Sequence, residues 1–309
     1  MSQSATQHSE FQFPPINHRL LAGIMIAGFF LVLLALLHLK FPIFNDETLY
    51  SDTAHRLIQG YGLSTTLFED FIPYLERYSY WYPPLYFYFL ALCYQVFGVS
   101  ITVARLFTLL SATAVLAVLY FLLKHWLISS KFVLIALALL IADHFFQDGA
   151  VVARMEMLTL LWGILALFFH LRFLDSRRQL ENFLSGLFSA ACILTHPIAA
   201  VVLTPIGINL LLINTRSWKE RFQTWLIYGV PIVANIFGWV VSFWENREIF
   251  WLQNYVQLHR KQYGLFYVVE ALKYKPFHRL IILIYYLSNL NLLVTFFQKK
   301  LYKIGRAHV

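Results

Sequence analysis

Charged residues are scarce in this sequence. They make up 13% of its 309 residues, whereas 59% are hydrophobic and the mean hydropathy is +0.62. A soluble domain carries about 25% charged residues. The deficit falls in several long apolar stretches, so the composition excludes intrinsic disorder, a collagen and a soluble enzyme with a single membrane anchor. We therefore expect an all-α fold, a polytopic bundle of transmembrane helices.

Cysteine is almost absent as well. The two cysteines, Cys93 and Cys192, both lie in apolar runs, which excludes a disulfide framework and a zinc cluster. The net charge of +8 does not call for nucleic acid as a partner, because the basic residues cluster in short loops between apolar runs. That pattern is typical of the cytoplasmic side of a membrane protein, and the expected partner is the lipid bilayer.

The apolar stretches have the lengths of membrane spans. Residues 1–19 are polar, and we expect them to form a cytoplasmic tail. Residues 20–39 are long enough to cross about 30 Å of hydrocarbon, and they exceed the apolar run of about 7–15 residues in a cleavable signal peptide. Further spans are expected at residues 101–123, 132–147, 156–171, 182–195, 197–213, 224–243 and 280–297.

The segment Leu85–Gly98 decides the topology. As a helix it would reach only about 21 Å, which is short of the hydrocarbon core, and its many aromatic residues prefer the headgroup level. We therefore expect an interfacial amphipathic helix in the first outer loop, with the N-terminus inside. The alternative is a membrane crossing, which would place residues 40–83 in the cytoplasm. In the expected topology the basic loops share the cytoplasmic side.

Several polar residues then converge on the outer face. Asp46 and Glu47 follow the first span, and two adjacent carboxylates there could accept a proton or hold a divalent cation. The alternative is a helix cap, because acids favour the first turn of a helix. The loop at residues 244–279 is strongly basic although it is expected outside.

Four short motifs occur in order across residues 45–197. Together they resemble the GT-C superfamily, multi-span glycosyltransferases that use polyprenyl-phosphate sugars and include the protein O-mannosyltransferases and the aminoarabinose transferases of lipid A. The motifs are Asp46-Glu47-x-x-Tyr50, Tyr82-Pro83-Pro84-Leu85-Tyr86 with Ala104-Arg105-Leu106 beyond it, Ala153-Arg154-x-Glu156 and Leu194-Thr195-His196-Pro197.

The resemblance implies roles for the acidic residues and their neighbours. Asp46 resembles the family's essential acid, a general base or metal ligand, and Glu47 would support it. Glu156 resembles the second acidic site, with Arg154 as an orienting partner or phosphate contact, although a simple ion pair at the end of a span is the alternative. Tyr50 would line the cavity.

Five other residues are expected to bind substrate: Tyr82, Arg105, His196, Arg260 and Lys261. Tyr82 departs from the His or Glu that is common in the family, which leaves open whether a divalent metal ion is held by Asp46 and Glu156. His196 stands where many members have Lys, and a structural role beside Pro197 is its alternative. Arg105 is expected to pair with an outer acid. In the basic loop, Arg260 and Lys261 would neutralise a lipid phosphate, with lipid headgroups in general as the alternative target.

The sequence therefore predicts a glycosyltransferase, a hexosyl or pentosyl transferase that inverts the anomeric centre. Residues 20–303 would form its catalytic module, at the outer face of a bacterial cytoplasmic membrane. A transporter or lipid flippase, and a polysaccharide polymerase or ligase, are the alternatives. Residues 304–309 back-translate to a string that resembles a sequencing-library adapter, so we expect them to be an artefact on a truncated reading frame.

Overall fold

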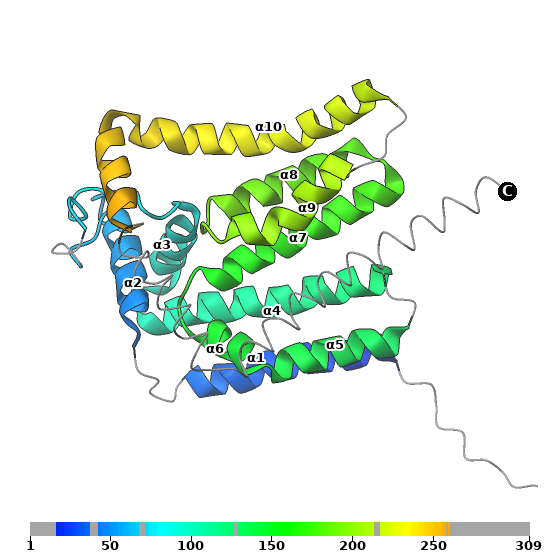
Figure 1. Cartoon of the computed structure of the whole chain (residues 1–309). Helices are drawn as coiled ribbons and strands as arrows, with labels where there is room; N and C mark the ends of the chain where they lie inside the picture. Colours follow the sequence, from blue (N-terminus) through cyan, green and yellow to red (C-terminus); the bar gives the residue numbers. More distant parts are fainter. Residues whose placement is uncertain are drawn as a thin grey trace, which may run out of the picture. The chain divides into compact units, whose positions relative to one another are not determined.

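The computed structural model describes residues 17–37, 43–67, 72–126, 129–212, 217–257 and 259, and these residues form helices and connecting segments without strands. The all-α, polytopic fold predicted from the sequence is confirmed. The helices (Figure 1) are α1 His18–Leu37, α2 Asn45–Ile58, α3 Leu85–Phe97, α4 Ile101–Trp126, α5 Ser130–Ala142, α6 His144–Val151, α7 Glu156–Ser176, α8 Gln179–Ile193, α9 Ala199–Leu212 and α10 Trp218–Phe243, followed by the 3-10 turn Trp244–Asn246.

The chain divides into two compact units. All ten helices belong to the first unit, Met1–Trp251, which also holds the predicted site residues from Asp46 to His196. In the second unit, Leu252–Val309, the described residues 252–257 and 259 are helical. The predicted span 280–297, the site residues Arg260 and Lys261 and the segment 304–309 lie outside the described residues.

Four of the described helices are long and apolar enough to cross a membrane: α1, α4, α7 and the helix that begins at Trp218. The span expected at residues 132–147 is not a straight helix, because the chain bends by 63° between α5 and α6. Asp143 causes the break: its carboxylate accepts the backbone N–H of Phe146 at 2.8 Å and so caps a new helix. The segments beside His196 form the short helices α8 and α9, as expected.

The two ends of the bundle are defined by contacts between helix termini. At one end, Arg154 just before α7 lies 3.4 Å from Asp46 in the first turn of α2. At the other end, His125 of α4 lies 2.7 Å from Asp175 of α7. Helices α4 and α7 therefore run in the same direction and α1 runs in the opposite one (Figure 1), so the end of α1 faces the same side as the start of α7. This is the arrangement expected if Leu85–Gly98 does not cross the bundle.

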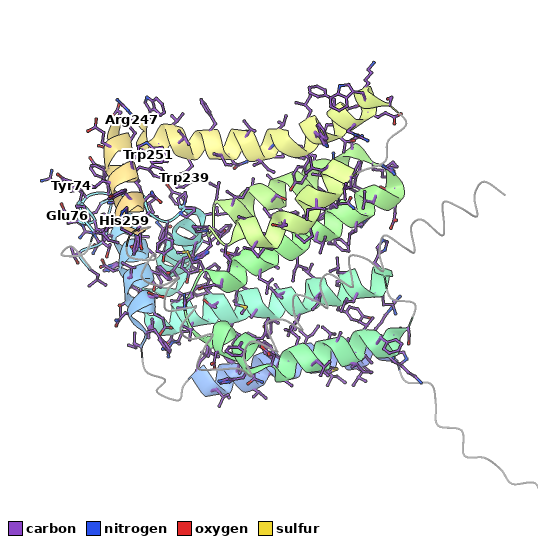
Figure 2. All side chains as sticks on the ribbon, in the orientation of Figure 1. Tyr74, Glu76, Trp239, Arg247, Trp251 and His259 are labelled. Carbon is purple, nitrogen blue, oxygen red and sulfur yellow. The ribbon has the colours of Figure 1, made fainter. Side chains whose placement is uncertain are left out.

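Helix α2 runs across the ends of the long helices rather than alongside them (Figure 1), and α3 packs against it. The ring of Tyr50 in α2 meets Tyr86 and Phe87 of α3 edge-on, at centroid distances of 5.8 and 6.0 Å. The backbone N–H of Leu85 donates to the carbonyl of Leu194 at 2.9 Å, which fixes the start of α3 to the end of α8. The segment between α2 and α3, with Glu76, lies at the same end (Figure 2).

Helices α8 and α10 approach each other closely at Gly186. A Cβ atom at that position would collide with the backbone carbonyl of Tyr228. Above and below this contact, Asn182 donates to the carbonyl of Thr224 at 2.8 Å, and the hydroxyls of Ser189 and Tyr228 lie 2.8 Å apart. Small residues that let backbones approach, with polar side chains bonding across, are the usual means by which membrane helices associate.

Candidate functional site

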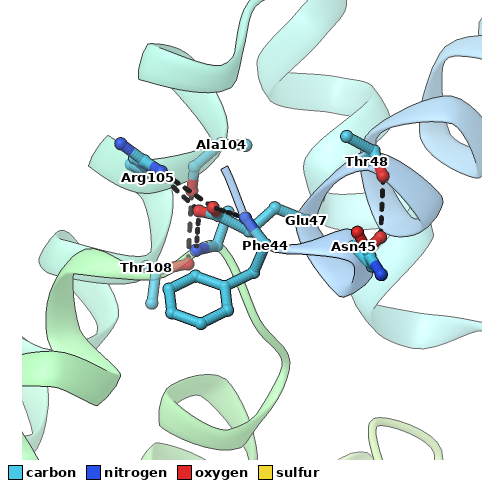
Figure 3. A network of polar contacts seen from close by, with 8 residues as sticks. Phe44, Asn45, Glu47, Thr48, Ala104, Arg105 and Thr108 are labelled. Atoms are coloured by element: carbon cyan, nitrogen blue, oxygen red, sulfur yellow. Dashed lines mark hydrogen bonds and ion pairs between the residues drawn. The ribbon is translucent and has the colours of Figure 1, made fainter. Parts of the chain in front are cut away.

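Glu47 is completely buried at the start of α2 and accepts hydrogen bonds from three residues (Figure 3). The guanidinium of Arg105 donates to both carboxylate oxygens at 2.8 Å. The backbone N–H groups of Ala153 and Phe44 donate at 2.7 and 3.0 Å. Glu47 therefore joins α2, α4 and the segment before α7, and the cap that the sequence left as an alternative is present for this acid.

These donors decide the protonation state of Glu47. Burial alone would raise the pKa of its carboxyl group, but the hydrogen bonds from Arg105, Ala153 and Phe44 outweigh burial and hold the pKa below its ordinary value. A carboxylate that is ionised and saturated with donors is a poor proton acceptor. In this geometry Glu47 positions its neighbours, and Arg105 is its partner in a buried ion pair, as expected of a guanidinium at that depth.

The lowered pKa gives a prediction about stability. Because the pKa of Glu47 is lower in the folded state than its ordinary value of 4.5, its stabilising contribution is complete above that value and is lost as the pH falls through the folded-state pKa. We expect the melting temperature of wild type minus that of Glu47→Gln to be constant between about pH 8 and 5 and to shrink below about pH 4.5. A difference that stays constant or grows in acid would contradict this assignment.

Asp46 and Glu156 share one guanidinium, that of Arg154. The Nη2 atom of Arg154 lies 3.4 Å from Asp46 and 2.6 Å from Glu156. We call these three residues the Arg154 cluster. Burial alone would lower the pKa of Arg154, but the charges of Glu156 and Asp46 outweigh it and raise the pKa. Two carboxylates against one guanidinium leave a net negative charge in the cluster.

The position of this cluster follows from Glu47. The carboxylate of Glu47 accepts a hydrogen bond from the backbone N–H of Ala153. Glu47 directly follows Asp46 in the sequence, and Ala153 directly precedes Arg154. The bond between Glu47 and Ala153 thus brings the two charged neighbours, Asp46 and Arg154, into contact. The sequence motifs did not predict the bond between Glu47 and Ala153, because its donor is a backbone N–H group rather than a recognisable side chain.

Two polar atoms of the cluster have no partner among the described residues. They are Nε of Arg154 and Oε2 of Glu156, and both are buried. A buried donor or acceptor without a partner costs about 1–3 kcal/mol. A bound group that accepts from Nε and donates to Oε2 would therefore be favoured at this position.

Aromatic side chains form one side of the cluster. The rings of Tyr50 and Tyr82 meet edge-on at 5.5 Å, and the ring of His196 lies 5.9 Å from that of Tyr82. Burial, reinforced by neighbouring charges, raises the pKa of both tyrosines, so both keep their protons at neutral pH and can donate hydrogen bonds. Nδ1 of His196 accepts the backbone N–H of Ile198 at 3.0 Å, which leaves the proton of a neutral ring on Nε2.

The described residues do not fit the metal site that the sequence suggested for Asp46 and Glu156. No group of three or more His, Cys, Asp or Glu side chains is placed to hold a metal ion within the part of the chain that the structure describes. The position between the two acids is taken by the cationic guanidinium of Arg154, which would repel a divalent ion. We therefore derive no catalytic step through a metal.

The described structure thus brings together, around the Arg154 cluster, all the predicted site residues except Arg260 and Lys261, which lie outside it. The roles of all these predicted site residues in binding or catalysis remain predictions. Glu47 and Arg105 lie beneath the cluster, as the ion pair that positions it.

Comparison with known proteins adds an independent observation. A family model described as dolichyl-phosphate-mannose-protein mannosyltransferase matches residues 82–244, more than half of the chain. The matched segment includes Tyr82, Arg105, Arg154, Glu156 and His196, whereas Asp46 and Glu47 precede it. No curated protein matches the chain. The resemblance to GT-C glycosyltransferases is confirmed, and the chain belongs to the dolichyl-phosphate-mannose-protein mannosyltransferase family of membrane glycosyltransferases.

Proposed function

We propose that this protein transfers a sugar from a polyprenyl-phosphate donor to an acceptor at the Arg154 cluster, on the outer face of the membrane. The observation that carries the proposal is the convergence of Asp46 and Glu156, from two distant motifs, on one guanidinium. A transporter would place such acids inside the bundle, along a substrate path. Here they lie at the helix ends, beside the α2 helix that runs across those ends (Figure 1).

Asp46 is the better candidate for the general base. Its contact with Arg154 is the longer of the two, 3.4 Å against 2.6 Å, and its side chain is 45% exposed against 33% for Glu156. A carboxylate that is weakly held and accessible can accept a proton from an acceptor hydroxyl or amine. Glu156 holds Arg154 more tightly and would orient it.

The reaction we propose is a direct displacement. As Asp46 removes the proton, the acceptor oxygen or nitrogen bonds to the anomeric carbon of the sugar, and the bond from that carbon to the phosphate oxygen breaks. The lipid phosphate leaves with the electron pair, and the configuration at the anomeric carbon inverts. The hydroxyls of Tyr50 and Tyr82, which keep their protons, would donate hydrogen bonds to the sugar.

The cluster itself carries a net negative charge, so a phosphate donor needs positive charge from elsewhere. Arg260 and Lys261 remain the proposed source, because basic side chains at the headgroup level attract lipid phosphates. Arg154 would add its unpartnered Nε as a donor to the leaving phosphate or to the sugar.

The donor can be tested in membranes that contain the overproduced protein. We expect radiolabelled mannose to move from a polyprenyl phosphate to an endogenous acceptor, and membranes with Arg154→Gln to be strongly impaired. A nucleotide-linked mannose should not act as the sugar donor once synthesis of the lipid-linked sugar is blocked. Transfer from the nucleotide sugar under that block, or equal transfer by Arg154→Gln, would contradict the proposal.

The proposed topology has α3 in the interface, the N-terminus inside and the site outside. It predicts the labelling of single cysteines by an impermeant thiol reagent, in a chain whose native Cys93 and Cys192 are replaced by alanine. Cysteines at the exposed positions Thr48 and Asp148 should react in intact cells. A cysteine at exposed Arg178, at the other end of the bundle, should react only after the membrane is made permeable.

Two outcomes would contradict this topology. If Thr48 and Arg178 react from the same side, α3 crosses the membrane and the two acids cannot share a site. If Arg178 alone reacts in intact cells, the whole orientation is reversed and the site faces the cytoplasm.

A further inference from the structure

A groove of about 530 Å³ lies between α1 and α4, at the opposite end of the bundle from the Arg154 cluster. Helix α1 contributes residues from Arg19 to Ile26, and α4 contributes residues from Ala117 to Lys124. Both sets are spaced i, i+3, i+4 and i+7, so each forms one face of its helix. Nothing in the proposed sugar transfer uses this groove.

The groove has a charged end and an apolar end. Helices α1 and α4 run in opposite directions (Figure 1), so Arg19 in the first turn of α1 lies at the same end as Lys124 in the last turns of α4. From these two cations the groove runs for two helical turns, about 10 Å, to Ile26 and Ala117. The polarity of the lining residues therefore changes along the groove as it does across one membrane leaflet, from charged headgroups to hydrocarbon.

A largely buried tyrosine lines the groove between its two ends. Tyr120 lines the groove one turn below Lys124 and is 8% exposed, and its hydroxyl has no hydrogen-bond partner among the described residues. An unpaired buried hydroxyl is unfavourable unless a ligand accepts from it. At that depth below the phosphates, the groups in a bilayer that accept hydrogen bonds are the ester carbonyls of a phospholipid.

We propose that this groove binds an anionic phospholipid. Its phosphate would lie between Arg19 and Lys124, an ester carbonyl would accept from Tyr120, and the upper part of one acyl chain would lie over Gly23. A Cβ atom at Gly23 would meet nothing within 4 Å, so there is open space above this residue. The lipid belongs to the leaflet opposite the proposed site of sugar transfer.

A second copy of the chain is a less suitable occupant. It would have to bring an acid to Arg19 and Lys124, and two of the acids at this end of the bundle, Asp175 and Glu181, are already paired with His125 and Arg172. The lipid supplies the missing negative charge. Because the proposal concerns the other end of the molecule and its readout is lipid binding, it does not depend on the proposed function.

Lipid titrations of the purified full chain, followed by native mass spectrometry, test the proposal. Phosphatidylglycerol should bind in preference to phosphatidylcholine, and inorganic phosphate should not displace it. Each cation near an anionic lipid contributes about a fivefold gain in affinity, so Arg19→Gln with Lys124→Gln should weaken the first binding constant by at least about tenfold. Lys131→Gln with Arg178→Gln, which removes two exposed cations outside the groove, should have little effect.

The groove itself is tested by filling it. Gly23→Leu should weaken phosphatidylglycerol binding although both cations remain, whereas Gly28→Leu, the same change at another open position of α1 outside the groove, should not. Equal binding of the two lipids, displacement by inorganic phosphate, or equal losses in the control variants would overturn the proposal. So would a change in oligomeric state with Gly23→Leu, which would make the groove an interface between copies. Melting temperatures would confirm that every variant is folded.

Discussion

Replacing Asp46 with asparagine is expected to reduce sugar transfer by about 10²–10⁴-fold, the usual loss when a positioned base is removed. Asparagine keeps the shape of the side chain but removes the charge and the ability to accept a proton at neutral pH. Since Asp46 is nearly half exposed, the change should leave expression and melting temperature close to those of wild type. Transfer of radiolabelled mannose from a polyprenyl phosphate in membranes is the measurement.

Two further variants sharpen this result. Glu76→Gln removes an acid from the segment between α2 and α3 (Figure 2). The carboxylate of Glu76 lies 3.9 Å from Nε of the exposed Arg77. This variant should leave transfer unchanged. Glu156→Gln should reduce transfer less than Asp46→Asn, because we assign Glu156 to orienting Arg154. Activity of Asp46→Asn above about a tenth of wild type would rule out its role as the base.

The largest effect on stability is expected at the buried ion pair. Arg105→Gln leaves the fully buried carboxylate of Glu47 without its cation, and breaking a buried pair on one side costs about 3–5 kcal/mol. We expect a large fall in melting temperature in detergent and a low yield of folded protein. Glu47→Gln should behave similarly, because it removes the carboxylate that the buried guanidinium of Arg105 contacts.

The double variant Glu47→Gln with Arg105→Gln separates pairing from packing. Because replacing both members of a buried pair is often close to neutral, the double variant should be more stable than the sum of the two single effects allows. Arg77→Gln serves as the control, since the exposed contact between Arg77 and Glu76 should contribute less than about 1 kcal/mol. Strictly additive losses would show that Glu47 and Arg105 act independently.

Hydropathy was sufficient to predict the helical bundle and its alternating directions, because span lengths and basic loops are properties of composition. It placed Asp46 and Glu156 at the same end only with the further inference, from its short length and aromatic residues, that Leu85–Gly98 does not cross the membrane. It could not predict the break at Asp143, where the apolar run continues on both sides and a single side-chain bond to Phe146 starts a new helix.

The burial of Glu47 and the exposure of Asp46 could not be predicted from the sequence for a related reason. The two acids are neighbours, and successive residues on a helix point about 100° apart, so one faces inward and the other outward. Which one faces inward depends on where Arg105 and the amide of Ala153 lie. Those positions are set by α4 and by the segment before α7, and nothing in the motif around Asp46 encodes them.

The hydrogen bonds of Glu47 also determine the order in which contacts can form while the chain is being synthesised. Two of its three partners come from later parts of the chain, Arg105 from α4 and Ala153 from the segment before α7. A nascent chain that has been made only as far as α3 offers this carboxylate no cation, and an unpaired charge is not stably buried. Glu47 must stay in water, or hold its proton, until Arg105 has left the ribosome and reached the membrane. The contact between Asp46 and Arg154 forms after that, so the Arg154 cluster assembles late in synthesis, and a chain that stops before residue 154 never acquires it.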